Sequence, residues 1–155
     1  MSTYTVEVVN SVEDSAFDRI YNSNSSTIDS NMGYSDKDRL KEKFSFLGKT
    51  NFLLQVKNNN TVVLYARIGL SSDKKEVFIT NIINDSNESF FNGVEVMNSY
   101  FKSNGVEYVM CESTENSSMY NSIIKSFNRP DLLEYDSNRN IVHDNGNIRS
   151  RLKIL

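Results

Sequence analysis

The sequence predicts a single α/β domain, 1–155, an α+β fold with a central mixed sheet of six to seven strands and about four flanking helices. Three apolar strands follow one another at 51–57, 62–70 and 76–83. Only short polar turns separate them, which indicates an antiparallel meander. An amphipathic helix then leads to a buried-type strand at 106–112. A strand–helix–strand passage of this length predicts a parallel crossover.

The first third of the sequence predicts one strand and two helices. Residues 3–9 alternate weakly and are expected to form the first strand. Ser11 is expected to cap a helix, because its hydroxyl can accept from free backbone N–H groups. The polar stretch 22–32 is expected to be a loop. Ser35 is expected to cap a second helix that ends at Gly48. The inner faces of these helices are Val12, Ala16, Phe17, Ile20 and Tyr21 in the first, and Leu40, Phe44 and Leu47 in the second.

Turn and cap residues mark the later elements. Asn58-Asn59-Asn60 predicts a tight turn, because asparagine tolerates the left-handed conformation. Asp85 and Glu88 form a D-x-x-E pattern typical of a capping box at a helix start. The buried stripe of that helix is Phe90, Val94, Met97 and Phe101, at helical spacing.

The last forty residues predict one more helix and the closing strands. A helix is expected over 116–127, and Pro130 cannot continue it. Residues 132–135 and 140–142 offer strand material. The sequence Asp144-Asn145-Gly146-Asn147 predicts a turn, and 148–155 is the last expected strand.

Composition excludes several classes of function. The net charge is −3 and no run of basic residues exists, so we expect no nucleic-acid partner. No signal peptide is recognisable and no segment approaches a membrane span, so a cytoplasmic protein without membrane contact is expected. The single cysteine, Cys111, lies in an apolar run and is interpreted as a buried small hydrophobe. His143 lacks neighbours at zinc-like spacing, so no metal site is expected.

The order of elements resembles the GNAT superfamily of N-acyltransferases along nearly the whole chain. The tail from Ile141 to Ile154 is similar to that family's final hairpin, and Asn116 stands where the family often has an asparagine after its fifth strand. The resemblance implies that acetyl-CoA inserts between two splaying strands. Its pantetheine would pair with backbone at about 80–83, and its pyrophosphate would lie at the following helix start. The implied cofactor-binding residues are Ile82, Ile83, Ser86, Asn87, Glu88, Ser89 and Asn116.

The resemblance also implies that an amine attacks the thioester directly while a base takes its proton, and that a tyrosine often protonates the thiolate. The position expected for this tyrosine holds Ile123, and Tyr120 lies one turn earlier. Asn81 and Glu112, near the ends of the two splaying strands, are alternative proton-handling groups. Their ordinary interpretations are a strand-edge amide and a solvated carboxylate, so the catalytic residues stay open.

The pyrophosphate loop departs from the family pattern. The family has a basic or amide residue followed by spaced glycines, whereas this chain has Asn84-Asp85-Ser86-Asn87-Glu88-Ser89. Glycine lets backbone approach phosphate closely, and two carboxylates would repel it. Two hypotheses follow: an acetyl-CoA-dependent N-acyltransferase acting on an amine acceptor, or a non-catalytic GNAT-like scaffold, such as a viral binding or structural protein with a protein partner.

Overall fold

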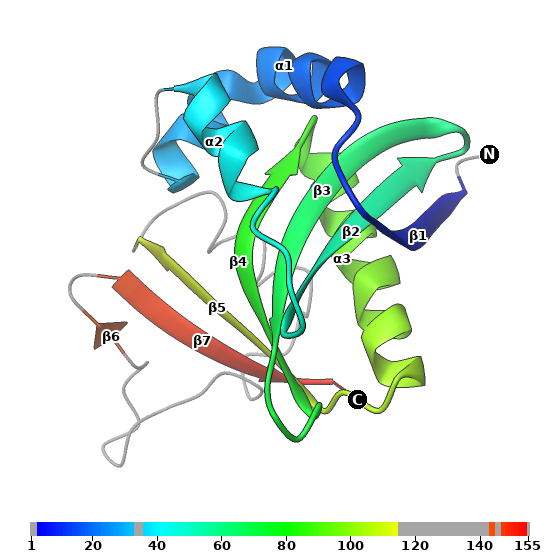
Figure 1. Ribbon diagram of the computed structural model, residues 1–155, viewed down its shortest axis with the longest axis vertical. Helices are drawn as coiled ribbons and strands as arrows, with labels where there is room; N and C mark the ends of the chain where they lie inside the picture. Colours follow the sequence, from blue (N-terminus) through cyan, green and yellow to red (C-terminus); the bar gives the residue numbers. More distant parts are fainter. Residues whose placement is uncertain (1–2, 33–35, 115–142, 145–146, 155) are drawn as a thin grey trace.

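The computed structural model describes residues 3–32, 36–114, 143–144 and 147–154, and side-chain surroundings for 3–24, 36–110 and 154. These residues form one mixed sheet with three helices, an α+β arrangement (Figure 1). The strands occur in the order β1-β2-β3-β4-β5-β7-β6 across the sheet. Along the chain the elements are β1 (Tyr4–Val9), α1 (Asp14–Met32), α2 (Lys37–Lys43), β2 (Asn51–Asn58), β3 (Thr61–Leu70), β4 (Glu76–Asn84), α3 (Asn87–Ser103), β5 (Tyr108–Thr114), β6 (His143–Asp144) and β7 (Asn147–Lys153).

The predicted pairing of the strands is confirmed. β1 to β4 are antiparallel neighbours, and β4 pairs with β5 in parallel. β5 then pairs antiparallel with β7, which pairs with the two-residue strand β6. The turn at Asn58-Asn59-Asn60 is also confirmed, since Asn59 has a φ of 57°. Short turns and one helical crossover therefore specify this part of the topology, as the sequence pattern indicates.

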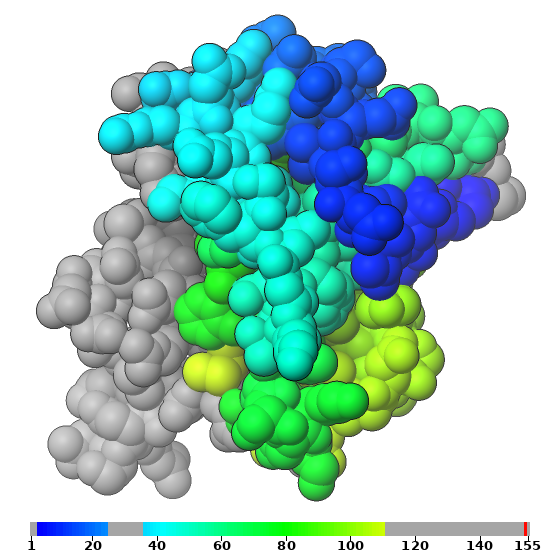
Figure 2. All heavy atoms as spheres, in the orientation of Figure 1, coloured from blue at the N-terminus to red at the C-terminus, as the bar shows by residue number. Residues whose placement is uncertain are grey.

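The sheet carries a hydrophobic core on each face. α3 covers one face, and its predicted stripe of Phe90, Val94, Met97 and Phe101 is buried against β2, β3 and β4. α1 and α2 cover the upper end of the other face, as Figures 1 and 2 show. That second core contains Phe17, Ile20, Tyr21, Leu40, Phe44, Leu53, Val62, Tyr65 and Ile83.

The prediction for the start and length of the first helix is wrong. α1 begins at Asp14, and the phenol oxygen of Tyr65 accepts from the Glu13 amide at 2.9 Å. A core tyrosine thus supplies the acceptor that Ser11 was expected to supply. The segment expected to be a loop continues the helix to Met32, with non-helical dihedrals at Asn24. The side-chain amide of Asn24 donates to the backbone carbonyl of Asn84 at 3.0 Å, so a contact to β4 holds the kink. This tertiary contact overrides the local preference of the segment for a loop.

Three predicted helix boundaries are also corrected. Asp36, not Ser35, caps α2, because its carboxylate accepts from the amides of Asp38 and Arg39. α2 ends at Lys43 with Phe44 as its C-cap, so Gly48 lies beyond the helix. Ser86, not Asp85, caps α3. The predicted helix at 116–127, the strand material at 132–135 and 140–142, and the residues Asn116, Tyr120 and Ile123 lie outside the described residues.

Candidate functional site between β4 and β5

The parallel ladder between β4 and β5 ends before either strand does. Its registered pairs run from Glu76 with Tyr108 to Ile79 with Cys111. β4 continues to Asn84 and β5 continues to Thr114, and the two strands diverge in Figure 1. From Ile82 onward, no strand in the described part of the chain is paired with this edge of β4. The sheet therefore presents a stretch of backbone that an extended ligand can pair with.

A β-bulge marks the position where the strands separate. The register between β3 and β4 shifts so that Arg67 pairs with Asn81 and Ile68 with Ile79, which leaves Thr80 as the extra residue on β4. The Thr80 hydroxyl donates to the Arg67 carbonyl at 2.8 Å. A bulge bends its strand and increases the local twist. The bend thus falls one residue beyond Ile79, where the ladder to β5 stops.

The sequence-predicted residues of β4 lie on this open stretch. Ile82 is buried in the α3-side core and Ile83 in the core beneath α1 and α2. Their side chains anchor the strand from both faces, so packing holds the backbone edge in place. Asn81, the candidate proton-handling residue, is buried and accepts from Arg67 Nε at 3.0 Å. Glu112 follows Cys111, the last residue of β5 that pairs with β4, but its side chain lies outside the described surroundings.

The remaining predicted residues form the start of α3. Ser86 is the N-cap, and its hydroxyl oxygen accepts from the amide of the buried Ser89 at 3.1 Å. Asn87 and Glu88 occupy the first turn, where backbone N–H groups have no partner within the helix. The cap thus uses one donor and leaves the first amides for another acceptor. Glu88 places a carboxylate beside them, and this charge is favourable to the helix dipole but not to an anionic ligand.

One cation that the sequence analysis missed lies beside this helix start. Arg19 of α1 contacts Asp85 through Nη1 and Oδ2 at 3.3 Å, and its Nη2 donates to the Val62 carbonyl. Asp85 therefore pairs with Arg19 and does not cap α3. The two residues are 66 positions apart in sequence, so no local pattern could have indicated the contact. Of the two negative charges expected to repel phosphate at this loop, Asp85 is paired with Arg19, so the repulsion comes from Glu88.

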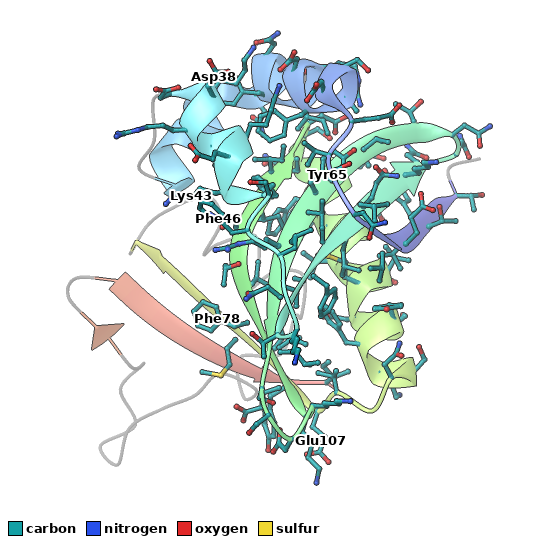
Figure 3. All side chains as sticks on the ribbon, viewed as in Figure 1. Asp38, Lys43, Phe46, Tyr65, Phe78 and Glu107 are labelled. Atoms are coloured by element: carbon teal, nitrogen blue, oxygen red, sulfur yellow. The ribbon has the colours of Figure 1, made fainter. Side chains whose placement is uncertain are left out.

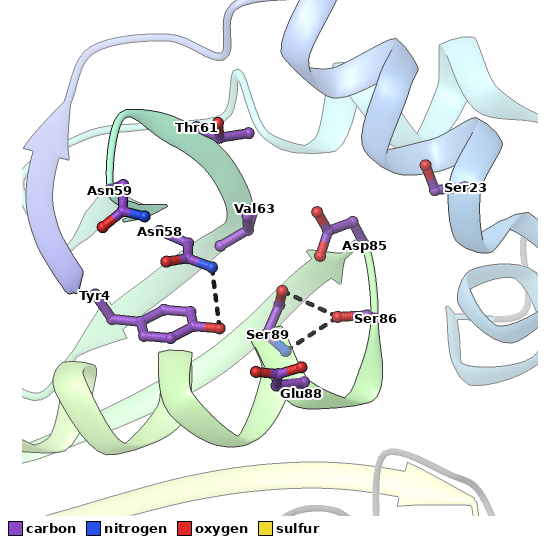
Figure 4. A pocket seen from close by; sticks show the side chains of 10 residues that line it. All are labelled: Tyr4, Ser23, Asn58, Asn59, Thr61, Val63, Asp85, Ser86, Glu88 and Ser89. Carbon is purple, nitrogen blue, oxygen red and sulfur yellow. Dashed lines mark hydrogen bonds between the residues drawn. The ribbon is translucent and has the colours of Figure 1, made fainter. Parts of the chain in front are cut away.

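A cavity of about 480 Å³ opens on the β2–β3 hairpin side of the same helix start (Figure 4). Its wall is polar: Tyr4, Asn58 and Ser23 face it together with Asp85 and Glu88. Asp85 Oδ1 and Asn58 Oδ1 are buried acceptors that have no hydrogen-bond partner within the described residues. Acceptor oxygens of this kind suit hydrogen-bond donors, so this cavity is poorly suited to phosphate.

A chain of polar groups runs from the buried side chains of Tyr65 and Gln55 to the exposed Glu7. The Tyr65 hydroxyl donates to Gln55 Oε1 at 2.6 Å, and Gln55 Nε2 donates to Glu7 Oε1 at 2.8 Å. Burial raises the pKa of the Tyr65 phenol, so it remains protonated at neutral pH. Because the phenol also accepts from Glu13, its bonds are satisfied within the fold. Tyr65 is therefore a structural residue and no candidate for proton transfer.

Comparison with known proteins gives the fold. No family model matches the chain, and no curated protein sequence matches it. Many solved structures do. A Salmonella typhimurium acetyltransferase that modifies the N-terminal serine of ribosomal protein L7/L12 superposes with a TM-score of 0.66 at 10% identity, covering 97% of this chain and 95% of that one. The chain has the GNAT fold.

Two further GNAT structures extend the comparison. The ribosomal-protein-S18-alanine N-acetyltransferase of Escherichia coli matches with a TM-score of 0.59 at 14% identity, over 98% of this chain and 94% of that one. A Bacillus subtilis acetyltransferase in complex with CoA matches with a TM-score of 0.54 at 13% identity, over 99% and 100%. The agreement over nearly the whole chain confirms the predicted resemblance.

The two halves of the site differ in how well they would suit CoA. The open edge of β4 offers backbone groups in extended geometry, which matches an amide-containing pantetheine arm. The α3 start offers free first-turn amides but also the Glu88 carboxylate, so it is a weakened site for pyrophosphate. Among the described residues no cluster of His, Cys, Asp or Glu could hold a metal ion. In the same residues no helix is long and apolar enough to span a membrane.

Proposed function

We propose that this chain is an N-acyltransferase that binds acetyl-CoA in the gap between β4 and β5. In the reaction the nitrogen of an amine acceptor bonds to the acyl carbon, the carbon–sulfur bond breaks, and the departing thiolate takes up a proton. The observation that carries the proposal is the early end of the β4–β5 ladder at Ile79 and Cys111. An open edge of this kind makes backbone N–H and C=O groups available to pair with an extended ligand.

In this proposal Ile82 and Ile83 present the backbone that pairs with pantetheine. Ser86, Asn87, Glu88 and Ser89 form the pyrophosphate end, and Asn116 is a further contact proposed from the resemblance. Since Ser86 Oγ already takes the Ser89 amide, only the amides of the first turn remain for phosphate oxygens. We therefore expect the pantetheine half to supply most of the affinity.

Calorimetric titration with acetyl-CoA and with acetyl-pantetheine, which lacks the nucleotide, tests this division. We expect both ligands to bind saturably, with Kd values within about tenfold of each other. This corresponds to a difference of about 1.4 kcal/mol in binding free energy. Binding of acetyl-CoA should also raise the melting temperature, because a ligand at a hundred times its Kd adds about 2.7 kcal/mol to stability. Absence of any binding by either ligand would overturn the proposal.

A second candidate is a GNAT-like scaffold without acyl transfer that binds a protein partner. The Glu88 carboxylate at the phosphate end favours it, because it opposes the anion that the fold would otherwise attract. A fold alone does not decide function. The two candidates separate on one result: the scaffold predicts that acetyl-CoA fails to bind even after the carboxylate of Glu88 is neutralised.

A further inference from the structure

A cationic side chain lies at the bulge with no negative partner. Arg67 of β3 shares the α1–α2 face of the sheet with Tyr65, two residues earlier. Its Nε donates to Asn81 Oδ1 at 3.0 Å and its Nη1 to the Phe46 carbonyl at 3.3 Å. Both acceptors are neutral. The ion pairs of the described residues do not include Arg67, although its side chain is half-buried. A partly desolvated guanidinium without a carboxylate is a binding group for an anion.

A cavity next to this guanidinium extends the positive surface. It encloses about 380 Å³ and is lined by Arg39, Glu42, Lys43 and Phe46. Sites for small molecules occupy roughly 300–1,000 Å³. The Phe46 ring is 49% exposed, and Lys43 Nζ lies 5.8 Å from its centroid. Figure 3 shows Lys43 and Phe46 next to each other below α2, on the side of β4 toward which β5 diverges.

Charge on this surface runs against that of the whole chain. Arg39 and Lys43 line the cavity with one carboxylate, Glu42, and Arg67 donates to the carbonyl of Phe46, which also lines it, in a protein whose net charge is −3. Arg39 likewise enters no ion pair among the residues that the structure describes. Arg67 is hydrogen-bonded to Asn81, the residue directly after the bulge. The charge of Arg67 therefore lies where β4 and β5 begin to diverge.

We propose that the acceptor is a small amine that also carries a carboxylate, as an amino acid does, and that Arg67 and Arg39 bind this carboxylate. The inference rests on the proposed acyl transfer and names the class of its second substrate. A cationic wall repels a simple ammonium ion but accepts a molecule that brings its own negative charge. The guanidinium fork matches a carboxylate with two parallel hydrogen bonds. Phe46 offers an apolar surface for the rest of the acceptor.

Thiol release from acetyl-CoA, followed with each proteinogenic L-amino acid and with its α-amide, tests the proposal. The amide keeps the amine and the side chain but removes the charge. For accepted amino acids we expect kcat/KM to be about tenfold or more higher than for the amide, mostly through KM, since charge-assisted hydrogen bonds are the strong ones. The amine of the α-amide is less basic than that of the amino acid, which by itself favours reaction of the amide. This difference therefore acts against the expected preference for the amino acid.

Variants identify the residues responsible. Arg67→Gln keeps a donor at the position of Nε, where it can still reach Asn81 Oδ1, and should reduce the acid-to-amide ratio to near one. Arg39→Gln, at an exposed position where folding is not at risk, should lower the same ratio severalfold. Lys102→Gln is the matched control, because it removes an exposed positive charge at the far end of α3 and should leave the ratio unchanged.

The outcomes separate this inference from the proposed function. Equal rates on acids and amides would overturn the carboxylate acceptor and leave acyl transfer standing. Absence of transfer to any amine, with Arg67-dependent binding of N-acetyl amino acids in calorimetry, would overturn acyl transfer and support the carboxylate site. Absence of both transfer and binding would overturn both.

Discussion

Glu88→Gln should raise affinity for acetyl-CoA and lower the stability of the protein at the same time. Glu88 is exposed in the first turn of α3, where the free amides of the helix start point. Two unit charges about 4 Å apart in water interact by about 1 kcal/mol. Removal of this carboxylate should therefore improve the Kd about fivefold at low ionic strength, and the gain should shrink as salt is added.

The same substitution removes a favourable charge from the helix dipole. A carboxylate in the first turn contributes roughly 0.3–1 kcal/mol to stability. For a chain of 155 residues, the melting temperature of the free protein should fall by about 1–4 °C. Calorimetric titration measures the affinity, and a thermal melt without ligand measures the stability. Opposite signs in the two assays are the expected signature of an anion site at this helix start.

Glu95→Gln provides the control for both assays. Glu95 is exposed on the same helix, two turns beyond the start, and the substitution changes the net charge equally. Its affinity and melting temperature should stay close to those of the parent. An equal gain in affinity in both variants would mean that overall charge is responsible. A Kd unchanged by Glu88→Gln at low salt would refute the assignment of phosphate to this site.

Three further predictions concern the fold around the site. Met97→Ala should cost about 2–5 kcal/mol in denaturant melts, because Met97 is fully buried between α3 and the sheet, and a loss below about 0.5 kcal/mol would contradict that packing. Tyr65→Phe should cost about 1–3 kcal/mol, since it leaves the Glu13 amide without its acceptor, and an unchanged melt would show that this bond contributes nothing. The hydrogen bond from Lys41 lowers the pKa of the Asp18 carboxyl. Its stabilisation is thus present at neutral pH and lost as pH falls through that lowered pKa. Asp18→Asn should flatten the melting temperature profile below about pH 5, and parallel profiles would contradict this role.

Local sequence patterns predicted the elements whose causes are local. The stripe of Phe90, Val94, Met97 and Phe101 repeats at helical spacing, and all four side chains are buried on the sheet. The asparagine turn at Asn58-Asn59-Asn60 and the parallel crossover are also confirmed, because each depends on a few adjacent residues or on a single connection length. The order of the elements along the chain carries the resemblance to the GNAT fold.

Contacts between distant residues account for what the sequence did not predict. The Tyr65 hydroxyl accepts a hydrogen bond from the Glu13 backbone amide and thereby sets the start of α1. The Asn24 side chain donates a hydrogen bond to the Asn84 carbonyl, 60 positions away in sequence. With this contact α1 continues through 22–32, the segment that the sequence pattern predicts as a loop. Arg19 neutralises Asp85 in the same manner. Each contact exists only after the sheet has brought α1 over β4, so no window of adjacent residues contains the information.

Burial at one end of the site and exposure at the other place the two ends under different constraints. The open edge at Ile82 and Ile83 is held by side chains buried in the two cores, so substitutions that would close it also disturb folding. The α3 start carries its charge on the exposed Glu88, where a substitution costs the fold little. Affinity for the phosphate end can therefore change while the gap between the strands stays intact. A GNAT fold with a complete gap and an acidic helix start is the combination that these unequal constraints allow.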